Sequence, residues 1–265
     1  MTGTGNADDD LSRLGRIEPM HAALDRTLIV MPALNEEASV ADVVREVYEK
    51  LPGVKCLVVD DGSTDNTIAE ARSAGADVAR LPFNLGVGGA MRVGFKYAVN
   101  NGYDNVIQID SDGQHDPSGV IKLLEALEVT DLAIGARFAG EGDYTVRGPR
   151  KWAMRVLSVT ISWVAGVKLT DTTSGFRASG PRAVRLFAEH YPAEYLGDTI
   201  ESLVIAARSG LRIQQVAVSM RPRAGGTPSH NPWKAATYLG RATMALTIAL
   251  LRPRLPDPEP GVAVV

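Results

Sequence analysis

The sequence predicts a single-domain α/β fold in which a mainly parallel sheet is flanked by helices. Short apolar runs alternate with helical patterns along the first half, and acidic residues directly follow two of these runs. The chain has 265 residues, of which 45% are hydrophobic and 22% charged, as expected for a packed globular core. Neither an internal repeat nor a low-complexity linker divides it, so one domain is the simplest organisation.

Five short apolar runs are typical of strands. They are Thr27–Met31, Lys55–Val59, Asp77–Arg80, Asn105–Ile109 and Asp131–Ala136. We expect Pro32 to close the first strand. Helical patterns lie between the runs, at Glu37–Leu51, from Ser63 or Thr64 to Ala74, at Gly88–Asn100 and from Pro117 to Leu127. Strands that alternate with helices imply right-handed crossovers and hence parallel pairing.

The second half is less regular. It contains two helical patterns, a strand, a basic loop and a further helix, at Arg150–Val167, Thr199–Ser209, Leu211–Val218, Arg221–Pro232 and Trp233–Leu251 respectively. We therefore divide the chain into a flexible leader (1–25), the main domain (26–230), a C-terminal amphipathic helix (231–253) and a flexible tail (254–265).

Charge and composition exclude some partners. The net charge of −3 argues against broad phosphate neutralisation, so nucleic acid is not expected as a partner. Cys56 is the single cysteine, which rules out a disulfide within the chain and fits a cytoplasmic location. No apolar run approaches the roughly 20 residues that span a bilayer.

The basic helix Trp233–Leu251 ends in an apolar stretch, a pattern that suits the surface of a membrane. The chain would then lie peripherally on the inner face of the plasma membrane. A membrane-protein partner, self-association or packing against the domain are the alternatives.

Acidic residues gather where strands end. Asp60 and Asp61 follow the second run, and Asp110 and Asp112 follow the fourth. Ligands of parallel sheets bind at this edge, where a divalent cation would compensate the charge and Gln114 could add a neutral oxygen. The alternative is that Asp60 and Asp110 only cap turns.

The turn Asn84–Ala90 is rich in glycine. It could direct backbone N–H groups toward an anion at a helix N-terminus, or be a simple turn. Its spacing is not that of a dinucleotide-binding fingerprint.

Five motifs in order carry a resemblance to a known family. They are PALNE (32–36), VVDDGSTDNT (58–67), NLGVGGA (84–90), QIDSDGQHDP (108–117) and DTTSGFRA (171–178). Over about residues 27–225 the chain resembles the family 2 inverting glycosyltransferases, and most of all their polyprenyl-phosphate sugar synthase branch, the relatives of dolichol-phosphate mannose synthase. The resemblance implies a GT-A fold, a nucleotide-diphosphate sugar donor, Mg²⁺ or Mn²⁺, and a polyprenyl-phosphate acceptor.

The resemblance also implies roles for residues. Pro32, Asn35 and Glu36 resemble the loop that borders the nucleotide, and Asp61 resembles the residue that reads the base, with Asp60 beside it. The residues that we further expect to bind the donor are Asn84, Gly86, Gly88, Ser111, Arg221 and Arg223. Asp110 and Asp112 match the Asp-x-Asp motif that holds the metal, with Gln114 as a further ligand. Asp171, Ser174, Gly175 and Arg177 match a motif that lines the donor sugar and the acceptor. Whether the donor is a UDP- or a GDP-sugar stays open.

The nature of the acceptor decides which further residues are needed. A lipid phosphate is already ionised, and Arg137, Arg177, Arg221 and Arg223 are candidates to grip it. A hydroxyl acceptor on a metabolite or glycan would need a base, for which Asp171 and then Glu201 are the candidates. Glu201 could equally be a solvated helix residue. A non-catalytic nucleotide-sugar-binding protein is the remote alternative, which the retained Asp110 and Asp112 disfavour.

Overall fold

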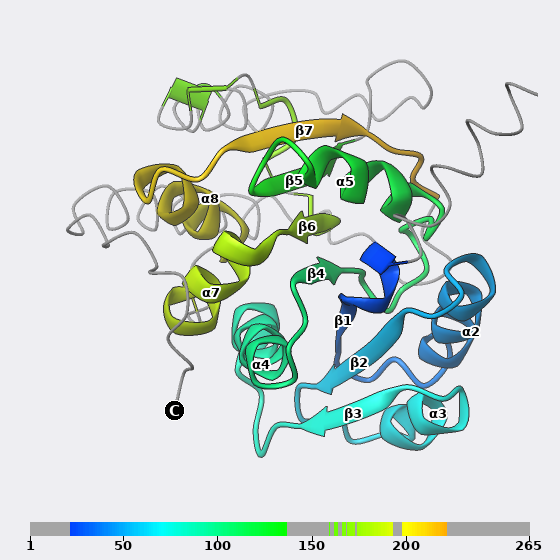
Figure 1. The fold of residues 1–265 in the computed structure, drawn as a ribbon. Coiled ribbons are helices and arrows are strands. Elements are labelled where there is room, and N and C mark those ends of the chain that lie inside the picture. The colour runs from blue at the N-terminus through cyan, green and yellow to red at the C-terminus, as the bar shows by residue number, and fades with distance from the viewer. Residues whose placement is uncertain are drawn as a thin grey trace, which may run out of the picture.

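A computed structural model describes residues 22–136, 159, 162–163, 166–167, 169–172, 174–192 and 198–221. Within these residues the strands are β1 (Thr27–Ala33), β2 (Lys55–Asp60), β3 (Asp77–Arg80), β4 (Asn105–Gln108), β5 (Leu132–Ala136), β6 (Arg177–Ser179) and β7 (Ile213–Ala217). The helices are α2 (Val40–Lys50), α3 (Thr67–Ser73), α4 (Gly86–Asn100), α5 (Gly119–Leu127), α7 (Pro181–His190) and α8 (Asp198–Arg208). The strands form one seven-stranded sheet in the order β3-β2-β1-β4-β6-β5-β7 (Figure 1).

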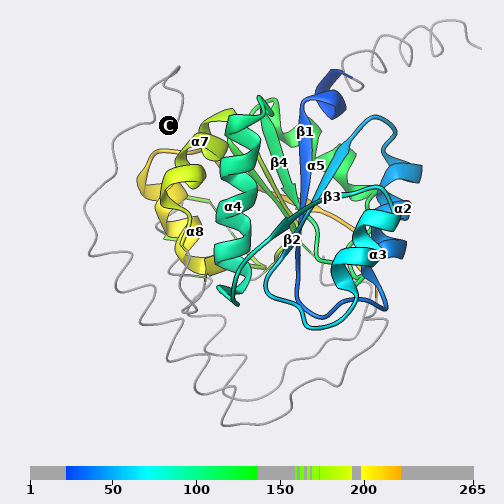
Figure 2. The ribbon, with the colours of Figure 1, turned by 90° about the horizontal axis from the view of Figure 1, so that it is seen from below.

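The sheet lies between two layers of helices. α4, α7 and α8 cover one face and α2, α3 and α5 the other (Figure 2). Alternate residues of β1 supply the two cores: Leu28 and Val30 pack in the α4 layer, and Ile29 and Met31 in the α2 layer. Because both faces are covered, β1 is apolar throughout, as is usual for a buried parallel strand. The predicted α/β fold with a mainly parallel sheet is confirmed.

The six predicted strands are all present, with shifted ends. The prediction that Pro32 closes the first strand is wrong, because β1 continues to Ala33. Pro32 pairs with Val59 of β2, whereas the pairing of β1 with β4 reaches only Val30. The missing N–H of Pro32 therefore costs no ladder hydrogen bond to β4, so a proline is tolerated inside this strand.

The sequence analysis missed β6 and α7. β6 is antiparallel to both of its neighbours, β4 and β5. It has only three residues, Arg177–Ser179, and one of them is charged, so no apolar run marks it. α7 begins with Pro181 at its first turn and packs chiefly against α4. Strand β6 matters for function because the DTTSGF segment leads directly into it.

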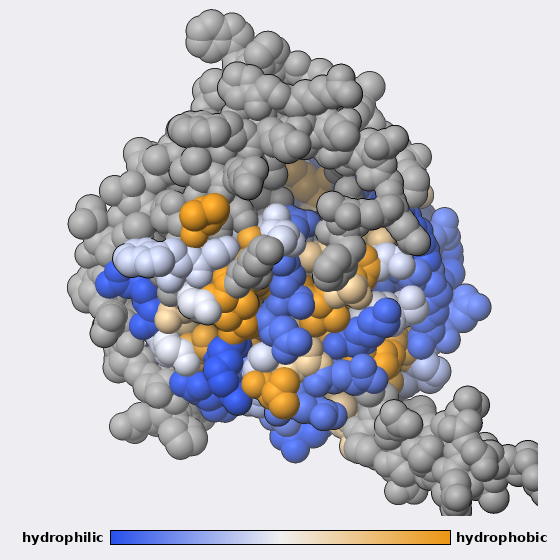
Figure 3. All heavy atoms as spheres, turned by 90° about the horizontal axis from the view of Figure 1, so that it is seen from above, coloured by the Kyte–Doolittle hydropathy of each residue, from blue (hydrophilic) through white to orange (hydrophobic). Residues whose placement is uncertain are grey.

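Two other predicted helices fall largely outside the described residues. Only a few residues of Arg150–Val167 are described, and Trp233–Leu251 is not described at all. Arg137, Arg223, the tail and residues 1–21 of the leader also lie outside the described residues. The end of the leader is described: residues 22–25 are helical, and Leu24 packs in the core, so the prediction of a flexible leader is wrong for these residues. Among the described residues no helix has the length and apolar character needed to cross a membrane. In Figure 3 the apolar side chains of the described surface form small groups between hydrophilic neighbours.

Helix α4 approaches the sheet closely at Gly94. A Cβ at this position would lie 2.5 Å from Cγ1 and 2.8 Å from Cγ2 of Val30. Val30 is fully buried in the middle of β1 and is stiff, because its side chain branches at Cβ. Glycine at this position thus sets the distance between α4 and the sheet.

We predict that Gly94→Ala lowers the free energy of unfolding by about 1–3 kcal/mol, because overpacking forces α4 away from β1. Lys96→Ala is the matched control, since Lys96 is exposed on the same helix and alanine keeps helix propensity. Urea denaturation measures both variants. Equal stability of Gly94→Ala and the wild type would show that the helix shifts without cost.

Candidate active site

The acidic segments meet at one edge of the sheet. β1 is paired in parallel with β2 on one side and with β4 on the other, so the carboxyl ends of all three strands lie together. Asp60 and Asp61 stand at the end of β2, and Asp110 follows β4. The backbone N–H of Asp61 donates to Ala33 O at 2.8 Å, and that of Ile109 to Val30 O at 3.1 Å. The predicted grouping of these carboxylates at one edge is thus present.

The loop after β1 is fastened to the segment after β2. Asn35 has a left-handed backbone (φ 56°), and its N–H donates to Ser63 Oγ at 2.9 Å. Its side-chain Oδ1 accepts from the N–H of Thr64 at 2.9 Å. The N–H of Glu36 donates to Thr67 Oγ1 at 2.8 Å. Asn35 tolerates this backbone better than most residues, and its hydrogen bonds hold the loop at the edge of the sheet.

Asp61 caps helix α4. Its Oδ1 accepts the N–H of Leu85 at 2.6 Å and its Oδ2 the N–H of Gly86 at 2.8 Å, and the residue is 4% exposed. A carboxylate here satisfies N–H groups that have no partner within the helix and interacts favourably with the helix dipole. Helix α4 therefore starts at Gly86, two residues before the predicted start, so Gly88 lies within its first turn. Two N–H groups of the glycine-rich turn are engaged by Asp61.

Asp60 is fully buried beside it. Both of its carboxylate oxygens accept the N–H of Ser63 at 3.3 Å. In the structure Asp60 therefore caps a turn, as the alternative interpretation expected. That Asp60 also binds the nucleotide stays a prediction. Asn84 lies at the same turn, where its Oδ1 accepts the N–H of Gly86 at 3.1 Å.

The segment after β4 folds back on itself. The N–H of Asp110 donates to Nδ1 of His115 at 3.0 Å, and the N–H of Gln114 to Oδ1 of Asp112 at 3.0 Å. Because His115 Nδ1 accepts a hydrogen bond, the ring in this arrangement is the neutral form protonated at Nε2. Ser111, which is buried, donates from Oγ to Pro32 O at 3.0 Å and so joins this segment to β1. The ring of His115 stacks on Phe176 at 5.0 Å, which makes His115 part of the wall of the site.

The chemistry of this segment fits a hard divalent cation. The Asp110 side chain is 41% exposed, and its described contacts are Gln108 Nε2 at 3.3 Å and the more distant His115 Nε2 at 3.7 Å. Its carboxylate is therefore partly open to solvent at the carboxyl end of β4. Among the described residues no three His, Cys, Asp or Glu side chains converge as a ready cage. Mg²⁺ bound with phosphates needs only one or two carboxylates, so the donor set is sufficient.

The DTTSGF segment lies against Asp110. A Cβ on Gly175 would stand 3.1 Å from Oδ2 and 3.2 Å from Oδ1 of Asp110. Ser174 is buried and donates from Oγ to Gly135 O at 2.5 Å. Nε2 of Gln215 donates to Asp171 O at 2.9 Å. Strands β5 and β7 therefore hold this segment, and the glycine is what lets its backbone approach the carboxylate.

The structure does not favour Arg177 as a residue that grips phosphate. Arg177 is 5% exposed, and its guanidinium donates to the carbonyl oxygens of Thr172, Ser174 and Thr199 and to Ser202 Oγ, at 2.8–3.1 Å. It pairs with Gln108 of β4 and Ile134 of β5 in the middle of the sheet. These contacts commit the guanidinium to the protein.

Arg221 forms ion pairs with carboxylates of the protein. Its guanidinium donates to both carboxylate oxygens of Glu46, at 2.8 and 2.6 Å, and its NH2 lies 3.5 Å from Asp116. Lys50 contacts the same two carboxylates at 2.8 Å. The N–H of Arg221 also donates to Gln114 O at 2.9 Å. Arg221 thus fastens the end of the β7 segment to the Asp110–Asp116 segment, a contact that the sequence prediction of phosphate binding did not include.

These ion pairs shift the acid–base equilibria of the cluster. The hydrogen bond from Arg221 lowers the pKa of Glu46, and that bond also raises the pKa of Arg221. Burial alone would raise the pKa of Asp116, but hydrogen bonds from Lys50 and Ser118 bring it well below its ordinary value. The cluster is therefore fully charged at neutral pH.

Glu201 is buried rather than solvated. It is 3% exposed in the first half of α8, next to Ser202 and close in sequence to Thr199, both of which Arg177 contacts. This contradicts the alternative of a solvated helix residue and leaves its role as a base untested. Ser202, Glu46 and Gln108 are residues of this region that the sequence analysis did not single out, because nothing in their local pattern distinguishes them from ordinary helix and strand positions.

Comparison with known proteins gives consistent results. The family model of "Glycosyl transferase family 2" matches residues 28–188. A polyprenol monophosphomannose synthase of Mycolicibacterium smegmatis is 38% identical over 164 residues, which are 58% of this chain and 61% of that protein. The match thus spans less than two thirds of that relative. An undecaprenyl-phosphate mannosyltransferase of Micrococcus luteus is 31% identical over 212 residues, 75% of this chain and 84% of that protein.

The fold is shared with a solved structure. Glucosyl-3-phosphoglycerate synthase from Mycobacterium tuberculosis, crystallised with Mn²⁺, UDP and phosphoglyceric acid, superposes with a TM-score of 0.68 at 24% identity. The likeness covers 89% of this chain and 83% of the other. It confirms the predicted fold, with helices on both faces of a mostly parallel sheet.

We predict that Glu46→Gln lowers the free energy of unfolding by about 1 kcal/mol at pH 7, because Arg221 loses its charged partner at a partly exposed position. The pKa of Glu46 is lowered on folding, so its contribution is complete above the unfolded value of 4.5 and is lost as the pH falls through the folded value. The difference between the variant and the wild type should therefore shrink below pH 4.5. Asp42→Asn, which breaks an exposed pair with Arg45 on the same helix, is the control and should be near neutral. A difference that stays constant down to pH 3 would contradict the pairing.

Proposed function

The chain belongs to glycosyl transferase family 2 and is a glycosyltransferase, and from this premise we propose that it transfers one sugar, with inversion, from a nucleotide-diphosphate donor to a polyprenyl phosphate. The observation that carries the acceptor class is the similarity to two relatives whose names specify sugar transfer to a polyprenol or undecaprenyl phosphate. The arrangement of Asp110 beside the Asp171–Phe176 segment supports it, since a donor and an acceptor must meet at one place.

Asp110, Asp112 and Gln114 are the residues that we propose to hold Mg²⁺ or Mn²⁺. Such an ion would neutralise the charge that develops on the departing diphosphate. The hydrogen bond of Ser111 to Pro32 O fixes this segment against β1, and the Asn35 contacts fix the loop at the same edge. We propose that this loop borders the nucleotide. Asp61 would hydrogen-bond to the base while it also caps α4. A single carboxylate would then contact both the base and the glycine-rich turn.

The acceptor phosphate needs a positively charged partner. The guanidinium groups of Arg177 and Arg221 already donate hydrogen bonds to protein oxygens. Arg137 and Arg223, which lie outside the described residues, are then the remaining candidates to bind it. Because the phosphate is already ionised, no general base is needed. Contact with a membrane surface, at the inner face of the plasma membrane, would bring the lipid to this edge.

A second candidate is transfer to a hydroxyl of a small metabolite. It is favoured by the structural neighbour with the same fold, which was crystallised with phosphoglyceric acid. Asp171 or Glu201 would then act as the base. The buried position of Glu201 beside the segment that begins at Asp171 is compatible with such a role.

Transfer assays separate the two candidates. Purified protein is incubated with UDP- and GDP-sugars and Mn²⁺ or Mg²⁺, together with a short polyprenyl phosphate, with phosphoglyceric acid, or with neither. We expect turnover only when polyprenyl phosphate is present. Turnover with phosphoglyceric acid and none with the lipid phosphate would replace the first proposal by the second.

We predict that Asp112→Ala lowers kcat for transfer by about 100-fold or more, because the departing diphosphate loses the charge stabilisation of its metal. Asp104→Ala is the control, since Asp104 pairs with Arg26 just before the amino end of β4, opposite the site. Both variants are assayed for transfer and for thermal unfolding. If Asp112→Ala keeps most of its metal-dependent turnover, Asp112 is not a metal ligand.

A further inference from the structure

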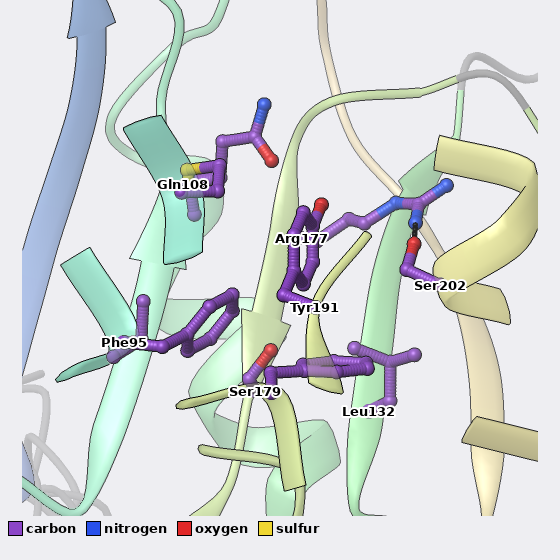
Figure 4. Close-up of a pocket in the computed structure, with 10 residues that line it drawn as sticks. Phe95, Gln108, Leu132, Arg177, Ser179, Tyr191 and Ser202 are labelled. Atoms are coloured by element: carbon purple, nitrogen blue, oxygen red, sulfur yellow. Dashed lines mark hydrogen bonds between the residues drawn. The ribbon is translucent and has the colours of Figure 1, made fainter. Parts of the chain in front are cut away.

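Arg177 lies directly behind the segment Asp171–Phe176, which the proposed function places beside donor and acceptor. Its Nε donates to Ser174 O at 2.8 Å and its NH2 to Thr172 O at 3.1 Å. Its NH1 donates to Thr199 O at 2.9 Å and to Ser202 Oγ at 3.0 Å, both in α8. Figure 4 shows the side chain extending from β6 toward Ser202 and away from Gln108. One guanidinium thus joins two parts of the chain that are about 25 residues apart.

These contacts provide hydrogen-bond donors for backbone carbonyl groups of the segment. The segment does not belong to a strand before Arg177. Phe176 O accepts the N–H of Gly135 in β5 at 2.8 Å, and Asp171 O accepts Nε2 of Gln215, whereas the carbonyl groups of Thr172 and Ser174 accept from Arg177. Thr172 and Ser174 are both buried, and a buried carbonyl without a donor is costly. The planar fork of arginine reaches three carbonyl groups at once, whereas the single ammonium of lysine has a different geometry.

The segment is in turn coupled to Asp110. A Cβ added to Gly175 would lie 3.1 Å from Gln108 Nε2 and 3.1 Å from Asp110 Oδ2. Gln108 donates to Asp110 Oδ1 at 3.3 Å and is the residue that pairs with Arg177 across the sheet. Glycine thus leaves less room beside the Asp110 carboxylate than a side chain needs, and a shift of the segment toward Asp110 would close that room.

We propose that Arg177 is a positioning residue: it ties the Asp171–Phe176 segment to the first turns of α8 and, through the close approach of the Gly175 backbone to Asp110, limits where that carboxylate can lie. The proposal rests on the proposed function for the role of Asp110, but the tie itself is a property of the fold. It differs from the expectation that Arg177 grips the acceptor phosphate, because it assigns the guanidinium to carbonyl groups of the protein.

Arg177→Lys separates geometry from charge. If Arg177 acts by positioning, the lysine variant should lose kcat by tenfold or more, with the KM for polyprenyl phosphate changed less than threefold. Arg177→Met, which keeps most of the apolar stem, should behave like Arg177→Lys. Ser202→Ala removes one of the four contacts and should have a smaller effect than either. A phosphate-binding role would instead raise the acceptor KM, spare the hydrolysis of the donor, and leave Arg177→Lys more active than Arg177→Met.

Hydrogen exchange provides a readout that needs neither donor nor acceptor. In Arg177→Lys the amides of residues 174–176 and of the first turn of α8 should exchange about 10–100-fold faster, while those of β1 keep their protection. Uniform loss of protection would mean global destabilisation and would count against a local tie. Unchanged exchange at residues 174–176 would overturn the proposal outright.

Gly175→Ala tests the second half of the coupling without touching Arg177. Its Cβ should displace Asp110 and weaken the binding of Mn²⁺ by threefold or more, measured by electron paramagnetic resonance with UDP and, in parallel, GDP. Gly180→Ala, at the other end of β6, is the matched control, because its Cβ would meet only ordinary contacts from 3.5 Å outward. Equal Mn²⁺ affinity of Gly175→Ala and Gly180→Ala would refute the coupling to Asp110.

The two proposals fail in distinguishable ways. If the wild-type protein binds no Mn²⁺ in the presence of either nucleotide, the proposed metal role fails, and with it the coupling to Asp110. The exchange data on residues 174–176 would still decide whether Arg177 ties the segment to α8.

Discussion

The parallel pairing of β1 with β2 and β4 is the constraint on which the site depends. It brings the loops after three strands to a single edge, and the cross-links Asp61 N–Ala33 O and Ser111 Oγ–Pro32 O hold them there. β1 is apolar on both faces, and the packing of its side chains in the two cores, together with these cross-links, holds the register of this pairing. A slip of β1 by one residue would bury the wrong side chains and separate the loops, so the stability of the core and the geometry of the site have the same origin.

The carboxylates at this edge have different surroundings. Asp61 is buried and receives two backbone N–H groups, so its charge stabilises the start of α4. Asp110 is partly exposed and has one long hydrogen bond from an amide, which leaves its charge available to a ligand. Motif resemblance treats these residues alike as parts of a nucleotide and metal site. Their burial and hydrogen bonds indicate which is engaged by the fold and which can bind a cation.

The arginines show the same division between structure and ligand binding. Arg177 and Arg221 lie close to the site, yet their guanidinium groups bind carbonyl groups and the Glu46 carboxylate respectively. Each connects a segment near Asp110 to a helix, α8 for Arg177 and α2 for Arg221. Positive charge near a phosphate site therefore does not by itself identify the residues that bind phosphate.

The sequence alone determined the α/β class, the six strands marked by apolar runs, the family resemblance and the edge at which Asp61 and Asp110 lie. These features follow from local periodicity and from motif spacing, both of which can be recognised in short stretches of the sequence. Strand β6, the cap formed by Asp61 on α4 and the partners of Arg177 and Arg221 were decided only by the tertiary structure. The cap and the partners of both arginines include contacts between residues 22 to 175 positions apart, and no local pattern records which distant carbonyl or carboxylate a side chain will meet.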